Sequence, residues 1–177
     1  MAILYFSGFC FENEKEFFSE YLIENNFTIS GFSYGAIKAM DKAYEMLKEN
    51  KRVDLIQLFS PAYFEDKNDK FKRLQLMFFQ KDAKAYSDNF IDNTIYPNKD
   101  IKDDLLKYFK MGTKDELSEL LYHKCNLDKM AFFKKKNVRI EVYLGEQDKI
   151  IDSVKAKDFY KEYAEVYFIK NVGHILR

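Results

Sequence analysis

Hydrophobic residues along the chain follow two patterns: short continuous runs, and longer segments in which they recur every three or four positions. The continuous runs are rich in Ile, Val, Leu, Phe and Tyr, and turn-forming residues close most of them, which is typical of buried strands. They occupy residues 2–6, 27–32, 53–59, 138–145 and the stretch that starts at residue 165.

The segments between these runs have the spacing of amphipathic helices, with charged residues in the remaining positions. The clearest apolar face consists of Ile37, Met40, Tyr44 and Leu47. A similar pattern runs from Glu12 to Leu22, and a third covers about residues 153–163. Strands that alternate with helices predict an α/β fold: an open, mostly parallel sheet of about five strands with helices on both faces.

This alternation breaks down after Pro61 and resumes only near residue 138. Apolar residues at helical spacing and charged connectors fill the interval, and Thr113 and Glu116 have the spacing of a capping box. The pattern therefore predicts an all-helical insertion at about residues 62–137 within a single domain of residues 1–177. We expect this insertion to act as a lid.

Composition limits the classes of partner. The chain has 177 residues, 47% of them hydrophobic, and its 29 basic and 29 acidic residues give a net charge of zero. Neither nucleic acid nor a membrane surface is expected as a partner, because no global charge attracts either one. With two cysteines, no secretory signal pattern and no apolar run of about 20 residues, the cytoplasm is the expected location.

One motif carries candidate chemistry: Gly31-Phe32-Ser33-Tyr34-Gly35, which lies between a predicted strand and a predicted amphipathic helix. Glycines two positions before and after a serine permit the tight turn that exposes a nucleophilic hydroxyl. The alternative is a serine in an ordinary turn. The setting favours Ser33 as a nucleophile, which needs a neighbouring base and a third group to orient that base.

Candidates for these partners follow the last two strands. His174 comes after the final run in a glycine-containing loop, whereas His123, the other histidine, falls in the insertion and is expected to pack on a helix. Asp148 follows Gly145 and is the expected acid, and Asp152 is the competitor that we expect to cap the next helix. The order Ser33, Asp148, His174 is that of a hydrolase triad. This chemistry requires neither a metal nor a cofactor.

The negative charge that develops in acyl transfer needs two backbone N–H donors. We expect the amide of Tyr34, directly after the nucleophile, and the amide of Phe9, in the loop after the first strand, with Cys10 as its neighbour. The dipole of the helix that starts near Tyr34 adds positive potential there. Cys10 itself has no accompanying base or acid pattern and is expected to be a buried thiol.

Together these residues resemble the α/β-hydrolase superfamily over essentially the whole chain, which implies a minimal α/β-hydrolase fold. The stretches 58–63 and 143–151 and the sequence YFSGFCFENEKEFF resemble the short BioV type of pimeloyl-[acyl-carrier-protein] methyl ester esterase. That resemblance implies a serine carboxylesterase of biotin synthesis, with an acyl carrier protein as partner. Ser7 and Gly8 stand where the family commonly has a His-Gly pair.

The resemblance also implies roles for particular residues of the insertion. Phe71, Leu74, Met77, Phe78 and Phe79 are candidates to line an acyl channel, although each of them also fits simple packing of the insertion onto the core. Lys70, Lys72 and Arg73 are candidates to contact an acidic carrier protein, as is the run 134–136, although such residues also fit a solvated face. The rival functions are another small-acyl esterase or thioesterase, and a binding module on a reduced hydrolase fold.

Overall fold

The computed structural model describes residues 4–177 and contains one five-stranded sheet. All neighbouring strands are parallel and the strand order follows the sequence, so the predicted parallel sheet is confirmed. The strands are β1 (Leu4–Phe6), β2 (Thr28–Phe32), β3 (Leu55–Phe59), β4 (Arg139–Gly145) and β5 (Glu165–Ile169). Of the first predicted strand, residues 2–3 lie outside the described residues.

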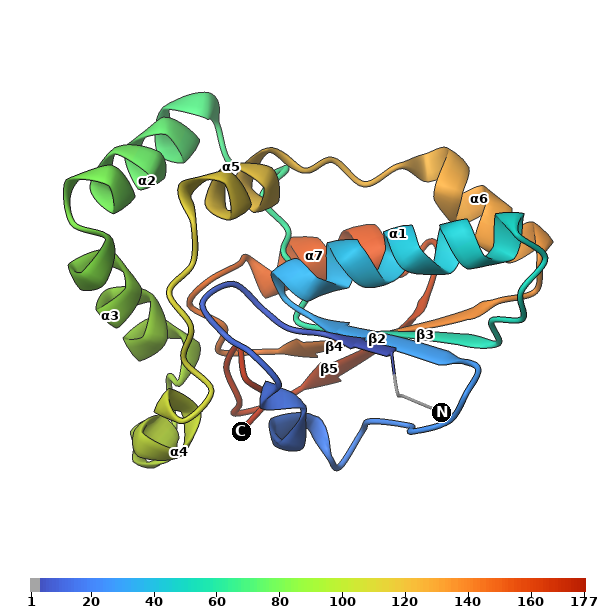
Figure 1. The fold of residues 1–177 in the computed structure, drawn as a ribbon, viewed down its shortest axis with the longest axis horizontal. Coiled ribbons are helices and arrows are strands. Elements are labelled where there is room, and N and C mark those ends of the chain that lie inside the picture. The colour runs from blue at the N-terminus through green and yellow to red at the C-terminus, as the bar shows by residue number, and fades with distance from the viewer. Residues whose placement is uncertain (1–3) are drawn as a thin grey trace.

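Three helices cover one face of the sheet: α1 (Tyr34–Lys48), α6 (Leu127–Lys135) and α7 (Ser153–Tyr160) (Figure 1). The predicted apolar face of α1 packs on the strands, and α6 lies beside α1, where the Tyr44 and Phe132 ring centroids are 5.0 Å apart. The α7 helix is three residues shorter at its C-terminal end than the pattern predicts, because residues 161–163 form turns.

The other face of the sheet is covered by irregular chain, the C-terminal segment and η1 (Glu14–Phe18), a 3-10 helix (Figure 1). The helix predicted from Glu12 to Leu22 is therefore wrong in extent. The side chain of Gln57 on β3 explains why no helix continues to Leu22. It accepts a hydrogen bond from Ile23 N (2.8 Å) and donates one to Tyr21 O (2.9 Å). These contacts hold the chain in an extended path across the sheet.

Aromatic side chains fill the core on this second face. The ring of Phe18 stacks on Phe59 at a centroid distance of 4.6 Å and lies 4.9 Å from Phe32. All three side chains are fully buried. The five-residue η1 therefore suffices to anchor the chain that covers this face, because Phe18 contributes a large apolar area.

Besides α6, the insertion between β3 and β4 contains all the remaining helices of residues 4–177, and these stand beyond the carboxyl ends of the strands, at the left of Figure 1. They are α2 (Asp69–Lys81), α3 (Ala83–Thr94), η2 (Lys99–Ile101), α4 (Lys102–Leu106) and α5 (Lys114–Tyr122). The predicted capping box of Thr113 and Glu116 is confirmed at the start of α5. No helix within residues 4–177 is long and apolar enough to cross a membrane.

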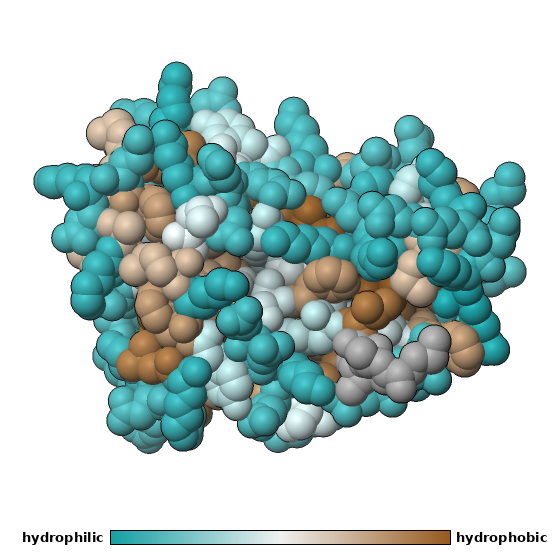
Figure 2. Space-filling view, in the orientation of Figure 1, coloured by the Kyte–Doolittle hydropathy of each residue, from teal (hydrophilic) through white to brown (hydrophobic). Residues whose placement is uncertain are grey.

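Polar and charged side chains cover most of the face seen in Figure 2, with hydrophobic residues interspersed over the helices of the insertion. Both cysteines are free thiols, Cys10 buried and Cys125 partly so.

The central strand gives a direct test of this core. Ile56 of β3 is fully buried, so Ile56→Ala should lower the free energy of unfolding by about 2–5 kcal/mol through lost burial and a cavity. Val154→Ala is the control, because Val154 on α7 is 55% exposed and should change stability by less than about 0.5 kcal/mol. Urea unfolding measures both, and equal effects would contradict this placement of the core.

Candidate active site

Ser33 lies on a sharp turn between the end of β2 and the start of α1. Its backbone has φ 51° and ψ −114°, a left-handed value of φ that costs a non-glycine residue free energy. Hydrogen bonds on both sides hold this conformation, from Ser33 N to Phe59 O (2.9 Å) and from Ala62 N to Ser33 O (3.1 Å). The hydroxyl caps no helix amide and is free for another partner.

The flanking glycines permit this turn because other backbone crowds both of them. A Cβ atom on Gly31 would lie 2.3 Å from Gly35 O, and one on Gly35 would lie 2.0 Å from Phe6 O at the end of β1. Only glycine fits at either position.

The structure brings Ser33, His174 and Asp148 together. His174 Nε2 lies 2.9 Å from Ser33 Oγ, and His174 Nδ1 lies 2.6 Å from Asp148 Oδ2. Both the His174 and Asp148 side chains are fully buried. The hydrogen bonds are consistent with one tautomer, in which Nδ1–H donates to Asp148 and Nε2 accepts from the Ser33 hydroxyl.

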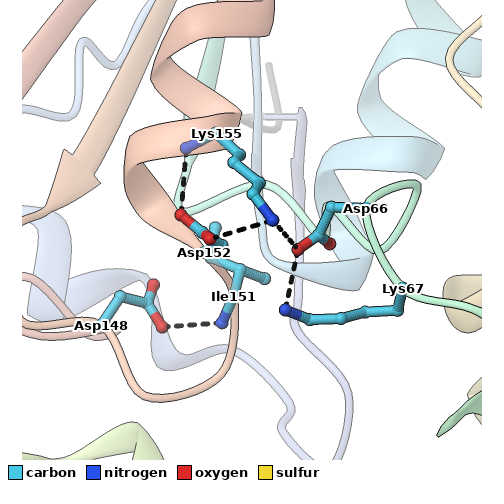
Figure 3. A network of polar contacts seen from close by, with 6 residues as sticks. All are labelled: Asp66, Lys67, Asp148, Ile151, Asp152 and Lys155. Atoms are coloured by element: carbon cyan, nitrogen blue, oxygen red, sulfur yellow. Dashed lines mark hydrogen bonds and ion pairs between the residues drawn. The ribbon is translucent and has the colours of Figure 1, made fainter.

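The second oxygen of Asp148 is also satisfied, since Oδ1 accepts hydrogen bonds from the amides of Ile150 (2.7 Å) and Ile151 (3.0 Å). Asp152 does not approach His174; as predicted, it caps α7 by accepting from Lys155 N (Figure 3). Lys155 and Lys67 both pair with Asp66, which joins the beginning of the insertion to the first turn of α7, after the loop that carries Asp148. Asp148 itself is held by the two backbone amides of its own loop.

Two close backbone approaches hold the loop of His174. A Cβ atom on Gly145 would lie 2.2 Å from Gly173 O, and one on Gly173 would lie 1.6 Å from Tyr96 O. The His174 ring also packs against Phe32, with centroids 5.1 Å apart. Residues just after α3 therefore support the base, a contact that no sequence pattern indicated.

The two predicted oxyanion donors are the amides of Phe9 and Tyr34. Within residues 4–177 neither Phe9 N–H nor Tyr34 N–H donates a hydrogen bond, whereas the preceding amide, Gly8 N–H, donates to Glu14 Oε1 (2.8 Å). Phe9 lines the same cavity as Ser33. Cys10 is buried as predicted, and burial raises the pKa of its thiol, which disfavours the thiolate needed for nucleophilic attack.

A cavity of about 260 Å³ opens from Ser33 toward the insertion. Its apolar walls include Phe64, Phe71, Phe90, Leu117, Leu120 and Leu121, and its polar lining includes Gln75, Asn89 and Asn93. Leu117, Leu120 and Leu121 form the apolar face of α5, which the sequence showed but did not assign to a pocket. The polar residues from α2 and α3 had no sequence signal.

Most of the predicted channel residues lie elsewhere. Of the predicted channel residues on α2, only Phe71 lines the cavity; Leu74 does not, and Met77 and Phe78 are 59% and 54% exposed. Phe79 is buried behind the wall, with its ring centroid 6.0 Å from that of Phe9. The prediction failed for Leu74, Met77 and Phe78 because helical spacing does not indicate which face of an insertion helix meets the cavity.

The basic residues predicted to contact a carrier protein differ in their exposure. Lys70 and Arg73 are exposed, but Lys72 is buried, with Nζ over the ring of Tyr122 at 5.3 Å from its centroid. The prediction that Lys72 contacts a carrier protein is therefore wrong. His123 ends α5, half-buried and outside the lining of the cavity, and burial lowers its pKa.

Comparison with known proteins identified structural neighbours only: no family model and no curated protein sequence matches the chain. BioG from Haemophilus influenzae is 12% identical with a TM-score of 0.61, over 98% of this chain and 88% of BioG. An esterase from Exiguobacterium antarcticum is 14% identical (TM-score 0.61; 83% of this chain and 59% of the esterase). A bromoperoxidase from Bacillus anthracis is 15% identical (TM-score 0.62; 84% of this chain and 60% of that chain).

The chain thus spans nearly all of BioG and about three fifths of the other two proteins. At these identities the likeness shows the fold, which is the α/β-hydrolase fold that the sequence predicted.

The crowding at Gly35 can be tested directly. Gly35→Ala would force a Cβ atom against Phe6 O, so we expect a loss of about 1–3 kcal/mol in the free energy of unfolding. Because the turn shifts with it, labelling of Ser33 by a fluorophosphonate should also slow. Urea unfolding and labelling kinetics measure the two effects. A variant that unfolds and reacts like the wild type would contradict the close approach of α1 to β1.

Proposed function

We propose that this protein is a serine carboxylesterase. The observation that carries the proposal is the continuous hydrogen-bonded chain from Ser33 Oγ through His174 to Asp148 at the carboxyl edge of the sheet. A serine hydroxyl is a weak nucleophile, and a base oriented by a buried carboxylate is the arrangement that activates it.

In the proposed mechanism Ser33 Oγ attacks the ester carbonyl while His174 Nε2 takes the hydroxyl proton. The alkoxide that forms accepts hydrogen bonds from the amides of Phe9 and Tyr34, and Asp148 stabilises the imidazolium. The tetrahedral intermediate collapses when His174 returns the proton to the leaving alkoxide, which departs as an alcohol. Water then attacks the acyl-enzyme by the same route, releasing the carboxylic acid and restoring Ser33.

The proposed substrate is the methyl ester of pimeloyl-[acyl-carrier protein], which would be hydrolysed to methanol and pimeloyl-[acyl-carrier protein] in biotin biosynthesis. Two observations support it: the motif resemblance to the short BioV type of esterase, and the structural likeness to BioG over nearly the full length of both chains. The mainly apolar cavity beside Ser33 suits a methylene chain, which gains free energy on leaving water.

An acyl carrier protein is the proposed partner. Lys70 and Arg73 flank Phe71, which lines the cavity, so an acidic carrier could be guided toward the cavity from this side of α2. Residues 134–136 end α6 just before β4 begins, at the amino edge of the sheet and opposite the cavity, so the prediction that they contact a carrier protein near the cavity is wrong. The cytoplasm is the proposed location, where Cys10 and Cys125 would stay reduced.

The catalytic assignment predicts a graded set of losses. Ser33→Ala should lower kcat by about 10⁴-fold or more, and Asp148→Asn by at least about 10²-fold, because the imidazole loses its orienting acceptor. Asp152→Asn is the matched control: it changes a carboxylate in the same loop but keeps the helix cap, and should leave kcat unchanged. Mass spectrometry of pimeloyl-carrier-protein methyl ester, incubated with each variant, measures the rates.

Two results would contradict the proposal at different levels. If the protein hydrolysed generic aryl esters but left the carrier-bound methyl ester intact, it would be a serine esterase or thioesterase of other specificity. A Ser33→Ala variant that kept all activity, or a wild-type protein that a fluorophosphonate failed to label, would point instead to a binding module on this fold.

Acyl-chain selection should depend on one face of α2. Phe71→Ala enlarges the cavity, so kcat/KM for aryl esters of longer acyl chains should rise relative to short ones. Phe78→Ala is the control on the same helix, because Phe78 is exposed and lies outside the cavity. Initial rates over a series of chain lengths measure the profile, and an equal change in both variants would refute the assignment of Phe71 to the cavity wall.

A further inference from the structure

Glu14 is a buried carboxylate that the proposed mechanism does not use. It begins η1, is 0% exposed, and lies beneath the loop that follows β1. Burial of a carboxyl group costs free energy unless the group makes hydrogen bonds. The presence of Glu14 at a buried position therefore points to a role for its hydrogen bonds. Desolvation raises its pKa, and hydrogen bonds from Gly8 and its other neighbours oppose that shift.

The contacts of Glu14 converge on one oxygen. Oε1 accepts a hydrogen bond from Gly8 N–H at 2.8 Å and another from the Tyr5 hydroxyl at 3.0 Å. The other oxygen, Oε2, is buried and has no partner among residues 4–177. The carboxylate therefore binds the backbone through Oε1.

Gly8 is consequently held at both of its polar groups. Its N–H donates to Glu14, and its carbonyl oxygen accepts from Phe11 N–H at 3.2 Å. A Cβ atom on Gly8 would lie 2.6 Å from the ring of Phe32, so the residue is also confined sterically. Little freedom is left in the orientation of the peptide group between Gly8 and Phe9.

That orientation decides where Phe9 N–H points. In a trans peptide the carbonyl oxygen and the next N–H point in opposite directions. With Gly8 O turned toward Phe11, Phe9 N–H points away from that turn, and it has no acceptor among the described residues. This is the amide proposed to stabilise the oxyanion.

We propose that Glu14 is the positioning residue of the oxyanion site: by accepting Gly8 N–H, its Oε1 fixes the Ser7–Gly8 peptide. Together with the hydrogen bond from Phe11 N–H to Gly8 O, this leaves the adjoining Gly8–Phe9 peptide one orientation, which aims Phe9 N–H at the developing alkoxide. This inference rests on the proposed serine-esterase chemistry but not on the identity of the acyl group. Glu14 touches neither Ser33 nor the reacting atoms.

A pair of matched variants tests the role. Glu14→Asp keeps the charge but withdraws the carboxylate by one methylene, about 1.5 Å, which breaks the hydrogen bond to Gly8. Glu141→Asp is the control, because Glu141 is a second buried carboxylate on the same face of the sheet, bonded to Gln57 and Tyr143. Glu14→Gln is the rescue variant, since its Oε1 can still accept from Gly8.

The readouts are kcat and KM on an aryl ester and the second-order rate of fluorophosphonate labelling at Ser33. For Glu14→Asp we expect kcat and labelling to fall by up to about 10²-fold, the scale of losing one oxyanion donor, with KM little changed. Glu14→Gln and Glu141→Asp should keep kcat near the wild-type value, although both are expected to be less stable.

Three outcomes would overturn the inference. The first is a Glu14→Asp enzyme with wild-type kcat and labelling rate; the second is a loss no greater than that of Glu141→Asp at equal thermal stability. A Glu14→Gln variant as impaired as Glu14→Asp would also refute it, because the acceptor would then be irrelevant. Failure of the wild type to label at Ser33 would instead defeat the proposed function itself.

Discussion

The close approach of backbone to backbone at the carboxyl edge of the sheet is the constraint on which this structure depends. Gly35 lets the first turn of α1 lie against the end of β1, and Gly31 lets the same turn fold back on β2. Together they place Ser33 in a left-handed conformation that hydrogen bonds from the neighbouring chain stabilise. Gly145 and Gly173 repeat this arrangement across the sheet and carry His174 to the same edge. The free energy that the strained turn costs is offset by the packing of the whole edge.

Much of this arrangement could be predicted because it follows from the direction of the strands. Parallel strands end at one edge, so Ser33, Asp148 and His174, each a few residues beyond a strand, had to lie near one another. The extent of η1 could not be predicted, because the side chain of Gln57, distant in sequence, takes the backbone groups that a longer helix would have used. The spacing of apolar residues also could not show whether Met77, Phe78 and Lys72 face the cavity, the core or solvent. An insertion helix has one face toward the cavity and another toward solvent, and the neighbouring helices decide which is which.

The insertion contacts the surroundings of Ser33, His174 and Asp148 at several points. The Tyr34 hydroxyl, on the residue after the nucleophile, donates a hydrogen bond to Glu119 of α5. Tyr96, just after α3, packs against the glycine beside His174, and Asp66 connects the start of the insertion to Lys155 near the acid loop. Residues beside or near Ser33, His174 and Asp148 thus each contact a different part of the insertion. A rearrangement of these helices would therefore alter the geometry of the three residues as well as access to them.

The sequential strand order also governs how the chain folds. The strands β1, β2 and β3 are neighbours in sequence, as are β4 and β5, but residues 60–138 separate β3 from β4. Closing that long loop costs conformational entropy, so pairing of β3 with β4 should follow the more local pairings. Ser33 belongs to the first group of strands, whereas Asp148 and His174 belong to the second. The hydrogen bond between Ser33 and His174 thus spans the junction, and the proposed hydrolytic activity requires that the two halves of the sheet have joined.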